Sequence, residues 1–177
     1  MSITTVWYFA YGSNMQSATL RGRRGIRFRR AVPARAAGWR LVFDKPPLVP
    51  IGESFANIVP DPAARVFGVA FEVTEPDLEH IELTEGVALG NYRRVAISAA
   101  PLSPFPAVQL DAFTLTSEQR DPGLQPSTRY MQLLVNGAQE HGLPAEHVDY
   151  LRAVPANPPT AEALHFGQLI DQALRRS

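Results

Sequence analysis

The hydrophobic and polar positions divide the chain into an earlier part rich in strand patterns and a later part rich in helix patterns. Residues 6–10 are apolar throughout, which predicts a strand buried on both faces. The prolines at 60 and 62 are expected to end a strand, because proline cannot donate to a sheet ladder. Strands grouped before helices predict an α+β fold with a mixed, mostly antiparallel sheet. The expected strands are 6–10, 31–43, 55–59, 66–73, 92–98 and 108–116, and the expected helices are 15–21, 76–84, 127–141, 144–154 and 160–175.

The first strand breaks at Gly12-Ser13-Asn14, before a helical pattern that starts at Met15. Ser13 or Asn14 is expected to be the N-cap, and Gly12 is expected to supply a backbone conformation that most residues cannot adopt. A strand, a glycine turn and a helix start leave backbone N–H groups unpaired, which suits an anion or a polarised carbonyl. The same tripeptide also fits an ordinary tight turn.

The helix expected at 76–84 leads to an acidic residue on its apolar side. Leu78 and Ile81 define the apolar stripe, and Glu85 follows them by seven and four residues, which places it near the middle of that stripe. A buried carboxylate is unfavourable unless it is paired or used in chemistry. Glu85 is therefore a candidate general acid/base. The alternative is a helix end in solvent, with Glu85 and Gly86 forming an ordinary C-cap.

Composition limits the classes of function. At 177 residues the chain has the length of a single domain, 1–177, and its 45% hydrophobic and 19% charged residues are typical of a globular protein. The absence of cysteine excludes disulfides, thiolate metal sites and a cysteine nucleophile. The four histidines lack metal-binding spacing, and Lys45 is the only lysine, which argues against Schiff-base chemistry. No signal peptide or membrane span is apparent, so a cytoplasmic location without membrane association is expected.

Residues 21–30 contain six arginines. Such a run is typical either of a nucleic-acid site or of a solvated surface. The net charge of the chain is zero, and Phe28 is the only aromatic residue available within the run to stack on bases. We therefore expect a solvated surface and no nucleic-acid partner.

Three blocks in the same order resemble the γ-glutamylcyclotransferase (AIG2-like) family. They are Tyr11-Gly12-Ser13-Asn14-Met15, then Glu85-Gly86-Val87 with Gly90-Asn91-Tyr92, and finally residues 130–144, which begin at Tyr130, contain Gly-Ala and close with Gly-Leu-Pro. The resemblance spans about residues 7–158, so the last helix lies outside it.

The resemblance implies a small mixed, mostly antiparallel β-barrel flanked by helices, with a pocket at its mouth. Family members release 5-oxoproline from γ-glutamyl compounds without cofactor or metal. Carried onto this chain, Glu85 is the general acid/base, and Tyr92 and Tyr130 line the pocket. Phe113 stands where better-known members carry a tyrosine. Tyr11, Gly12, Ser13, Asn14 and Met15 would hold the glutamyl group.

The sequence leaves two questions open. The substrate expected from the resemblance is a γ-glutamyl amino acid, a γ-glutamylamine or a γ-glutamyl group on a biosynthetic intermediate. A non-catalytic binding or regulatory protein on the same fold is the alternative to an enzyme, although the acid at Glu85 favours catalysis. The oligomeric state does not follow from the sequence.

Overall fold

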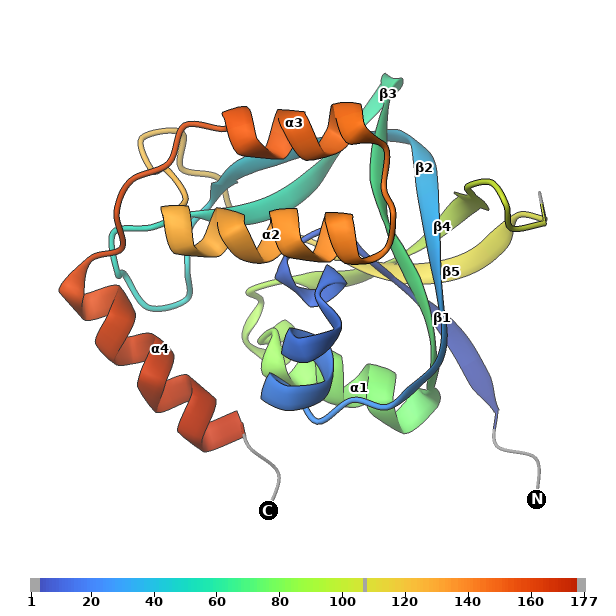
Figure 1. Cartoon of the computed structure of the whole chain (residues 1–177). Helices are drawn as coiled ribbons and strands as arrows, with labels where there is room; N and C mark the ends of the chain where they lie inside the picture. The colour runs from blue at the N-terminus through green and yellow to red at the C-terminus, as the bar shows by residue number, and fades with distance from the viewer. Residues whose placement is uncertain (1–3, 107, 175–177) are drawn as a thin grey trace.

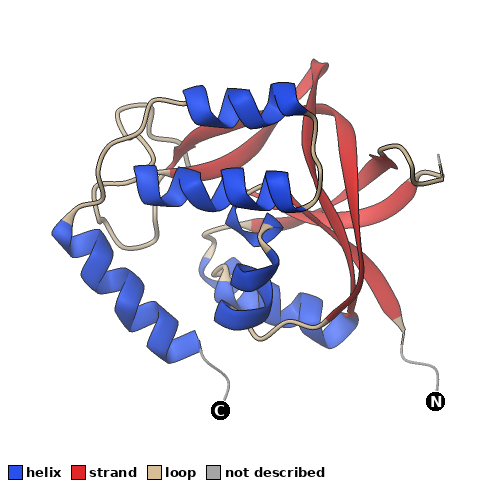
Figure 2. Cartoon of the chain, viewed as in Figure 1, coloured by secondary structure: helices blue, strands red, loops and turns tan. Residues whose placement is uncertain are grey.

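The computed structural model describes residues 4–106 and 108–174. Five strands close into a barrel in the order β1-β3-β2-β4-β5 (Figures 1 and 2). Neighbouring strands are antiparallel except β1 and β5, which are parallel and close the barrel. The expected mixed, mostly antiparallel barrel flanked by helices is therefore confirmed. The strands are β1 (Thr5–Ala10), β2 (Phe28–Lys45), β3 (Phe55–Thr74), β4 (Arg93–Pro101) and β5 (Leu110–Thr116).

The helices cover the barrel unevenly. Helices α2 and α3 pack side by side against it, and α4 lies apart from them beyond the loop that joins β2 to β3 (Figure 1). Within the described residues no helix is both long and apolar enough to cross a membrane. The expected end of the last helix, Arg175, lies outside the described residues. The helices are α1 (Glu75–Thr84), α2 (Thr128–Glu140), α3 (Ala145–Ala153) and α4 (Ala161–Leu174), with short turns η1 (Ser13–Met15), η2 (Thr19–Arg23) and η3 (Val87–Leu89).

Strand β3 is longer than the sequence predicts, because it continues through the two prolines that were expected to end it. Pro60 pairs with Trp39 of β2, and pairing resumes at Arg65 opposite Ala37. Residues 61–64 therefore bulge opposite the single residue Gly38, whose φ is +82°. A bulge accommodates Pro62 without breaking the long hairpin. The prediction of two separate strands was wrong for this reason.

The glycine at the centre of β3, Gly68, lies where the backbone of β1 approaches closely, a common reason for glycine inside a strand. A Cβ atom on Gly68 would lie 2.3 Å from the carbonyl oxygen of Ala10 and 2.8 Å from Cζ of Phe9. Both contacts are with β1, and Phe9 is completely buried. The space left by Gly68 therefore fixes the position of β1, whose carboxyl end leads into the candidate site.

Helix α2 contacts the turn after β1 through another glycine. A Cβ atom on Gly137 would lie 2.7 Å from the backbone nitrogen of Gln16 and 2.8 Å from Cβ of Met15. Met15 is completely buried. The absence of a side chain at Gly137 thus allows α2 to pack directly on this turn.

We expect Gly137→Ala to lower the free energy of unfolding by about 1–3 kcal/mol through overpacking, although alanine favours a helix by about 1 kcal/mol over glycine. The displaced turn should also lower activity. Gly167→Ala in α4 is the control for stability, because no described atom would lie closer to its Cβ than Nη1 of Arg129 at 3.5 Å. Urea denaturation of both variants tests this prediction, and equal stabilities would contradict it.

Candidate active site

The turn after β1 differs in detail from the expected helix start. Gly12 itself is the N-cap of η1, without a side-chain capping bond, so neither Ser13 nor Asn14 takes that role. The φ of Gly12 is −109°, so this residue does not adopt the left-handed conformation that favours glycine. Space is the constraint instead, since a Cβ atom there would lie 3.2 Å from the hydroxyl of Tyr130. Among the described residues, the backbone N–H groups of Ser13 and Asn14 have no acceptor.

Glu85 lies where the helical pattern predicts it. Helix α1 begins with Thr74 as its N-cap, and Thr74 Oγ1 accepts a hydrogen bond from the N–H of Asp77 (3.2 Å). Glu85 is the C-cap and still has helical geometry, because its N–H donates to the carbonyl of Ile81 (2.9 Å). Its side chain is 19% exposed. The carboxylate therefore turns inward with the buried stripe rather than out into solvent.

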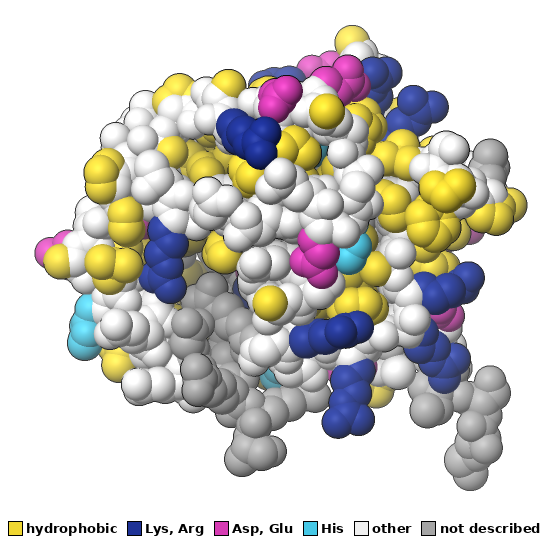
Figure 3. Space-filling model, in the orientation of Figure 1, with side chains coloured by type: hydrophobic (Ala, Val, Ile, Leu, Met, Phe, Trp, Pro, Cys, Tyr) yellow, Lys and Arg dark blue, Asp and Glu magenta, His cyan; other side chains and the backbone are white. Residues whose placement is uncertain are grey.

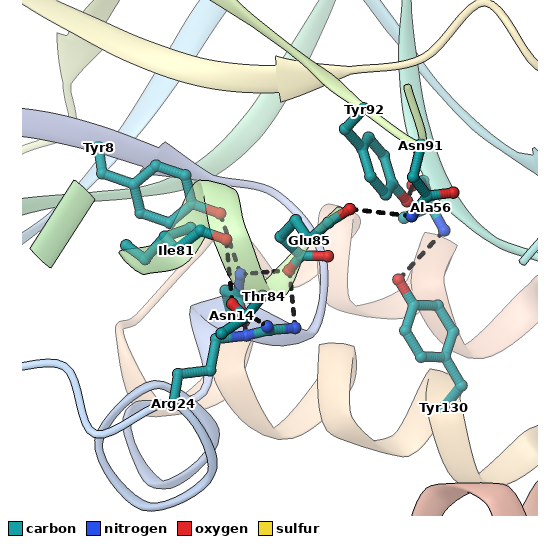
Figure 4. A network of polar contacts seen from close by, with 10 residues as sticks. All are labelled: Tyr8, Asn14, Arg24, Ala56, Ile81, Thr84, Glu85, Asn91, Tyr92 and Tyr130. Carbon is teal, nitrogen blue, oxygen red and sulfur yellow. Dashed lines mark hydrogen bonds and ion pairs between the residues drawn. The ribbon is translucent and has the colours of Figure 1, made fainter. Parts of the chain in front are cut away.

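The Glu85 carboxylate is paired with Arg24, which the sequence did not indicate. Arg24 Nη2 lies 2.7 Å from Glu85 Oε1, and Asn14 Nδ2 donates to the same oxygen (3.0 Å) (Figure 4). Arg24 also donates to Asn14 Oδ1 (2.8 Å) and to Thr84 Oγ1 (2.5 Å). The other oxygen, Glu85 Oε2, accepts no hydrogen bond from the described residues. One oxygen of the carboxylate is thus held by two donors, and the other has no hydrogen-bond partner among the described residues.

The expectation of a solvated arginine run was wrong for Arg24, whose side chain is only 8% exposed. Arg21, Arg27, Arg29 and Arg30 are exposed as expected. On the face drawn in Figure 3, Lys and Arg side chains lie in separate small groups. The described arginines of the run therefore have different environments, and one of them belongs to the site.

Four tyrosines surround this carboxylate. Tyr8 accepts a hydrogen bond from Asn14 Nδ2 (3.0 Å), and Tyr11 donates to the carbonyl of Leu115. Burial raises the pKa of Tyr8 and of Tyr11 above the ordinary value, and the Glu85 carboxylate raises both further. These phenols therefore keep their protons at neutral pH.

The other two tyrosines meet at one residue of β3. Tyr92 donates to the carbonyl of Ala56 (3.2 Å), and the N–H of Ala56 donates to the hydroxyl of Tyr130 (3.1 Å) (Figure 4). Burial raises the pKa of both hydroxyls. Because both side chains are anchored on Ala56, the wall opposite Glu85 is held by the barrel itself.

Lys45 forms a second connection to Glu85, through the backbone. Lys45 Nζ donates to Asn91 Oδ1 (2.6 Å) and to the carbonyl of Pro46, and Asn91 Nδ2 donates to the carbonyl of Glu85 (2.9 Å). Lys45 is 1% exposed, and burial lowers its pKa to about 8, while the Glu85 carboxylate opposes that shift. The apolar strand before it, ending in a lone lysine, was the available signal for its burial.

A cavity of about 370 Å³ joins these groups. The structure brings most of the candidates from the sequence together around this cavity: Tyr11, Gly12, Ser13, Asn14, Glu85, Tyr92 and Tyr130. The cavity is also lined by three residues that sequence reasoning missed, namely Tyr8, Arg24 and Lys45.

Two candidates lie elsewhere. Met15 does not line the cavity, since it is buried beneath α2. Phe113 is also not a lining residue, because its ring packs against the guanidinium of Arg94 at 4.4 Å. The hydroxyl that Phe113 lacks is therefore not missing from this cavity. Among the described residues, no three His, Asp or Glu side chains form a group suited to a metal ion.

Comparison with known proteins indicates similarity to one family. The profile of the AIG2-like family matches residues 65–151, which include Glu85, Asn91, Tyr92 and Tyr130. The chain is 31% identical over 165 residues to the γ-glutamyl cyclotransferase aclK of Aspergillus oryzae, an alignment that covers 83% of this chain. The chain is thus similar to the AIG2-like family and to γ-glutamyl cyclotransferases.

The alignments with two further γ-glutamyl cyclotransferases also cover most of this chain. The γ-glutamyl cyclotransferase gliK of Aspergillus fumigatus is 29% identical over 93% of this chain and 68% of its own length. Human γ-glutamylcyclotransferase is 27% identical over 85% of this chain and 79% of its own length. The chain spans 60% of the length of the aclK protein.

Solved structures of other proteins share the fold. A γ-glutamyl cyclotransferase structure superposes with a TM-score of 0.78 at 23% identity, covering 96% of this chain and 99% of its own. The human protein loc79017 superposes with a TM-score of 0.76 at 24% identity, covering 94% and 98%. The α+β barrel architecture is thus that of the family.

We expect Arg24→Gln to lower the free energy of unfolding by about 1–3 kcal/mol, because it leaves the partly buried Glu85 carboxylate without its cation. Arg21→Gln is the matched control, since Arg21 is exposed and its guanidinium lies over the Phe28 ring. Chemical denaturation at neutral pH measures both. An equal, small effect of the two substitutions would show that the ion pair contributes nothing to stability.

The pKa of Lys45 gives a pH-dependent prediction. Between pH 8 and 10.5 the folded protein has released the Lys45 proton, whereas the unfolded chain retains it. The unfolded state then binds more protons, so this residue makes the free energy of unfolding rise with pH over that interval. Lys45→Met should remove the rise. Denaturation curves of wild type and variant on both sides of pH 8 test this, and parallel pH dependences would contradict it.

Proposed function

We propose that this protein releases 5-oxoproline from γ-glutamyl amino acids or γ-glutamylamines by intramolecular cyclisation. The observation that carries the proposal is the Glu85 carboxylate, with Oε1 held by Arg24 and Asn14 and Oε2 free at a cavity. A fixed carboxylate with one available oxygen suits a proton acceptor that acts at a single position. The names of the related γ-glutamyl cyclotransferases support the same reaction class.

The reaction needs one proton acceptor that later becomes a donor. The α-amine nitrogen of the glutamyl group attacks its own γ-carbonyl carbon, forming the lactam C–N bond. Glu85 accepts a proton from the attacking amine and returns a proton to the leaving nitrogen as the original amide bond breaks. No water is consumed, and the carboxylate ends the cycle unprotonated. Because both reacting groups belong to one molecule, holding the folded conformer contributes much of the acceleration.

The charge that develops on the carbonyl oxygen needs preorganised donors. The cavity offers the unpaired backbone N–H groups of Ser13 and Asn14 and the hydroxyl groups of Tyr8 and Tyr130, whose protons are not donated to any described residue. We assign the stabilisation of the oxyanion and the binding of the glutamyl group to these donors. In this role Ser13 is a backbone donor and not a nucleophile.

Glu85→Gln tests the role of the carboxylate. It should lower the rate of 5-oxoproline release by a factor of about 10²–10⁴, the usual contribution of a positioned acid/base. Glu79→Gln is the control, because Glu79 is exposed on the same helix. The measurement is 5-oxoproline formed from a panel of γ-glutamyl amino acids and amines, with circular dichroism to confirm folding.

Two outcomes would count against the proposal. Wild-type rates in a folded Glu85→Gln variant would remove this residue from the mechanism. Tight binding of γ-glutamyl compounds without any release of 5-oxoproline by the wild type would favour a non-catalytic binding protein on the same fold.

A further inference from the structure

Part of the cavity is lined by residues that have no role in the proposed cyclisation. Away from the tyrosines, its walls are apolar side chains from the β2–β3 loop, from helix α4 and from the region where α1 ends. They are Leu48, Val49, Leu83, Leu89, Phe166 and Ile170. We call this set the apolar wall.

Helix α4 places one face on the cavity. Ala163, Phe166, Gly167 and Ile170 all line it, and their spacing of three, four and seven residues puts them on one side of a helix. The residues on the other side, such as His165 and Gln168, are exposed. In a globular protein such a stripe normally packs against the core. Here it forms a wall of the site and leaves space before it.

The start of α4 is hydrogen-bonded to the β2–β3 loop, which carries Leu48 and Val49 of the apolar wall. Thr160 Oγ1 donates to the carbonyl of Ile51 (3.0 Å) and accepts from the N–H of Ala163 (3.0 Å). The β2–β3 loop and the first turn of α4 are thereby held together. These hydrogen bonds fix the β2–β3 loop and the start of α4 relative to each other, and with them the two parts of the apolar wall that these segments carry.

Several members of the apolar wall are exposed to an unusual degree for large apolar side chains that share one cavity. Leu48 is 50% exposed, Leu83 67% and Leu89 69%. Single exposed leucines are common, but a group around one cavity indicates a binding surface. A ligand with a large apolar group removes this surface from water, which favours binding. A small leaving group such as glycine leaves it exposed.

The charged groups of the cavity are mostly engaged with one another. Arg24 pairs with Glu85, and Lys45 is bonded to Asn91. Arg129 at the start of α2 also lines the cavity, is exposed, and has no ion-pair partner among the described residues. A carboxylate on the leaving group is therefore compatible with the cavity, but the apolar wall does not require one.

We propose that the γ-glutamyl substrate carries a large apolar group on its amide nitrogen, and that this group binds against the apolar wall. The inference rests on the proposed cyclotransferase function, since it assigns the leaving amine of that reaction. The two sources of such a group are an apolar amino acid and an apolar amine without a carboxylate. Phenylalanine and phenethylamine represent them.

The test compares kcat/KM for γ-glutamyl-phenylalanine, γ-glutamyl-phenethylamine and γ-glutamylglycine. Discrimination between groups that differ in apolar size is commonly tenfold or more, so we expect at least about a tenfold preference for the two aromatic compounds. If the phenylalanine compound is the better of the two, Arg129→Gln should remove that advantage. The preference for the aromatic compounds over γ-glutamylglycine tests whether the apolar wall binds the leaving group. The comparison between the two aromatic compounds tests whether that leaving group is an amino acid or an amine.

Variants in α4 locate the effect. Phe166→Ser and Ile170→Ser should reduce the preference for aromatic compounds at least about threefold, since each removes apolar contact area. Leu164→Ser and Leu169→Ser are the matched controls, because both leucines are exposed on α4 and do not line the cavity. Circular dichroism confirms that α4 remains folded in all four variants.

The outcomes separate this inference from the proposed function. Release of 5-oxoproline with equal kcat/KM for all three compounds would overturn the apolar wall as a specificity site while the reaction class stands. If no compound is turned over, the proposed function fails, and calorimetric binding of the same compounds decides the inference. Preferential binding of the aromatic compounds that Phe166→Ser weakens would support it, and equal binding would reject it.

Discussion

The ion pair between Arg24 and Glu85 is the interaction on which the site depends. A carboxylate that is mostly removed from water is unfavourable without a cation and hydrogen-bond donors. Arg24 comes from the segment after β1 and Glu85 from the end of α1, so the pair joins parts of the chain 61 residues apart, with Asn14 bonded to both side chains. The same contacts that satisfy the buried charge also fix which carboxylate oxygen is available. The contacts of Glu85 with Arg24 and Asn14 therefore both stabilise the buried carboxylate and set its orientation.

Glu85 is also held through its backbone, and this explains the loop that follows α1. Gly86 and Gly90 both have φ of +72°, a left-handed conformation that other residues adopt with strain. They turn the chain so that Asn91 bonds back to the carbonyl of Glu85 while accepting from Lys45. Side chain and backbone of Glu85 are thus fixed by different partners, which is the arrangement that an acid/base of defined geometry requires.

The sequence predicted those features of the structure that depend on interactions between residues close in the chain. The stripe through Leu78 and Ile81 and the inward direction of Glu85 follow from helical spacing, and the structure confirms them. Features that depend on distant pairing were missed. Strand β3 continues past Pro60 because β2 supplies a partner on both sides of a bulge. Arg24 cannot be distinguished from its neighbours in the arginine run by spacing, because its burial is decided by Glu85 and Asn14, which lie elsewhere in the chain.

The groups to which we assign the proposed chemistry and the residues of the apolar wall lie on different parts of the fold. The chemical groups lie on segments tied into the barrel: the turn held by Gly137, the end of α1, and tyrosines anchored on Ala56. Four of the six residues of the apolar wall come from the β2–β3 loop and α4, which lie outside the part of the chain that the family profile matches, whereas Leu83 and Leu89 lie within it. Helix α4 is hydrogen-bonded to that loop through Thr160 and makes few contacts with the strands of the barrel. Substitutions in α4 should therefore leave the barrel undisturbed. An arrangement of this kind allows one cyclisation chemistry to be combined with different leaving groups.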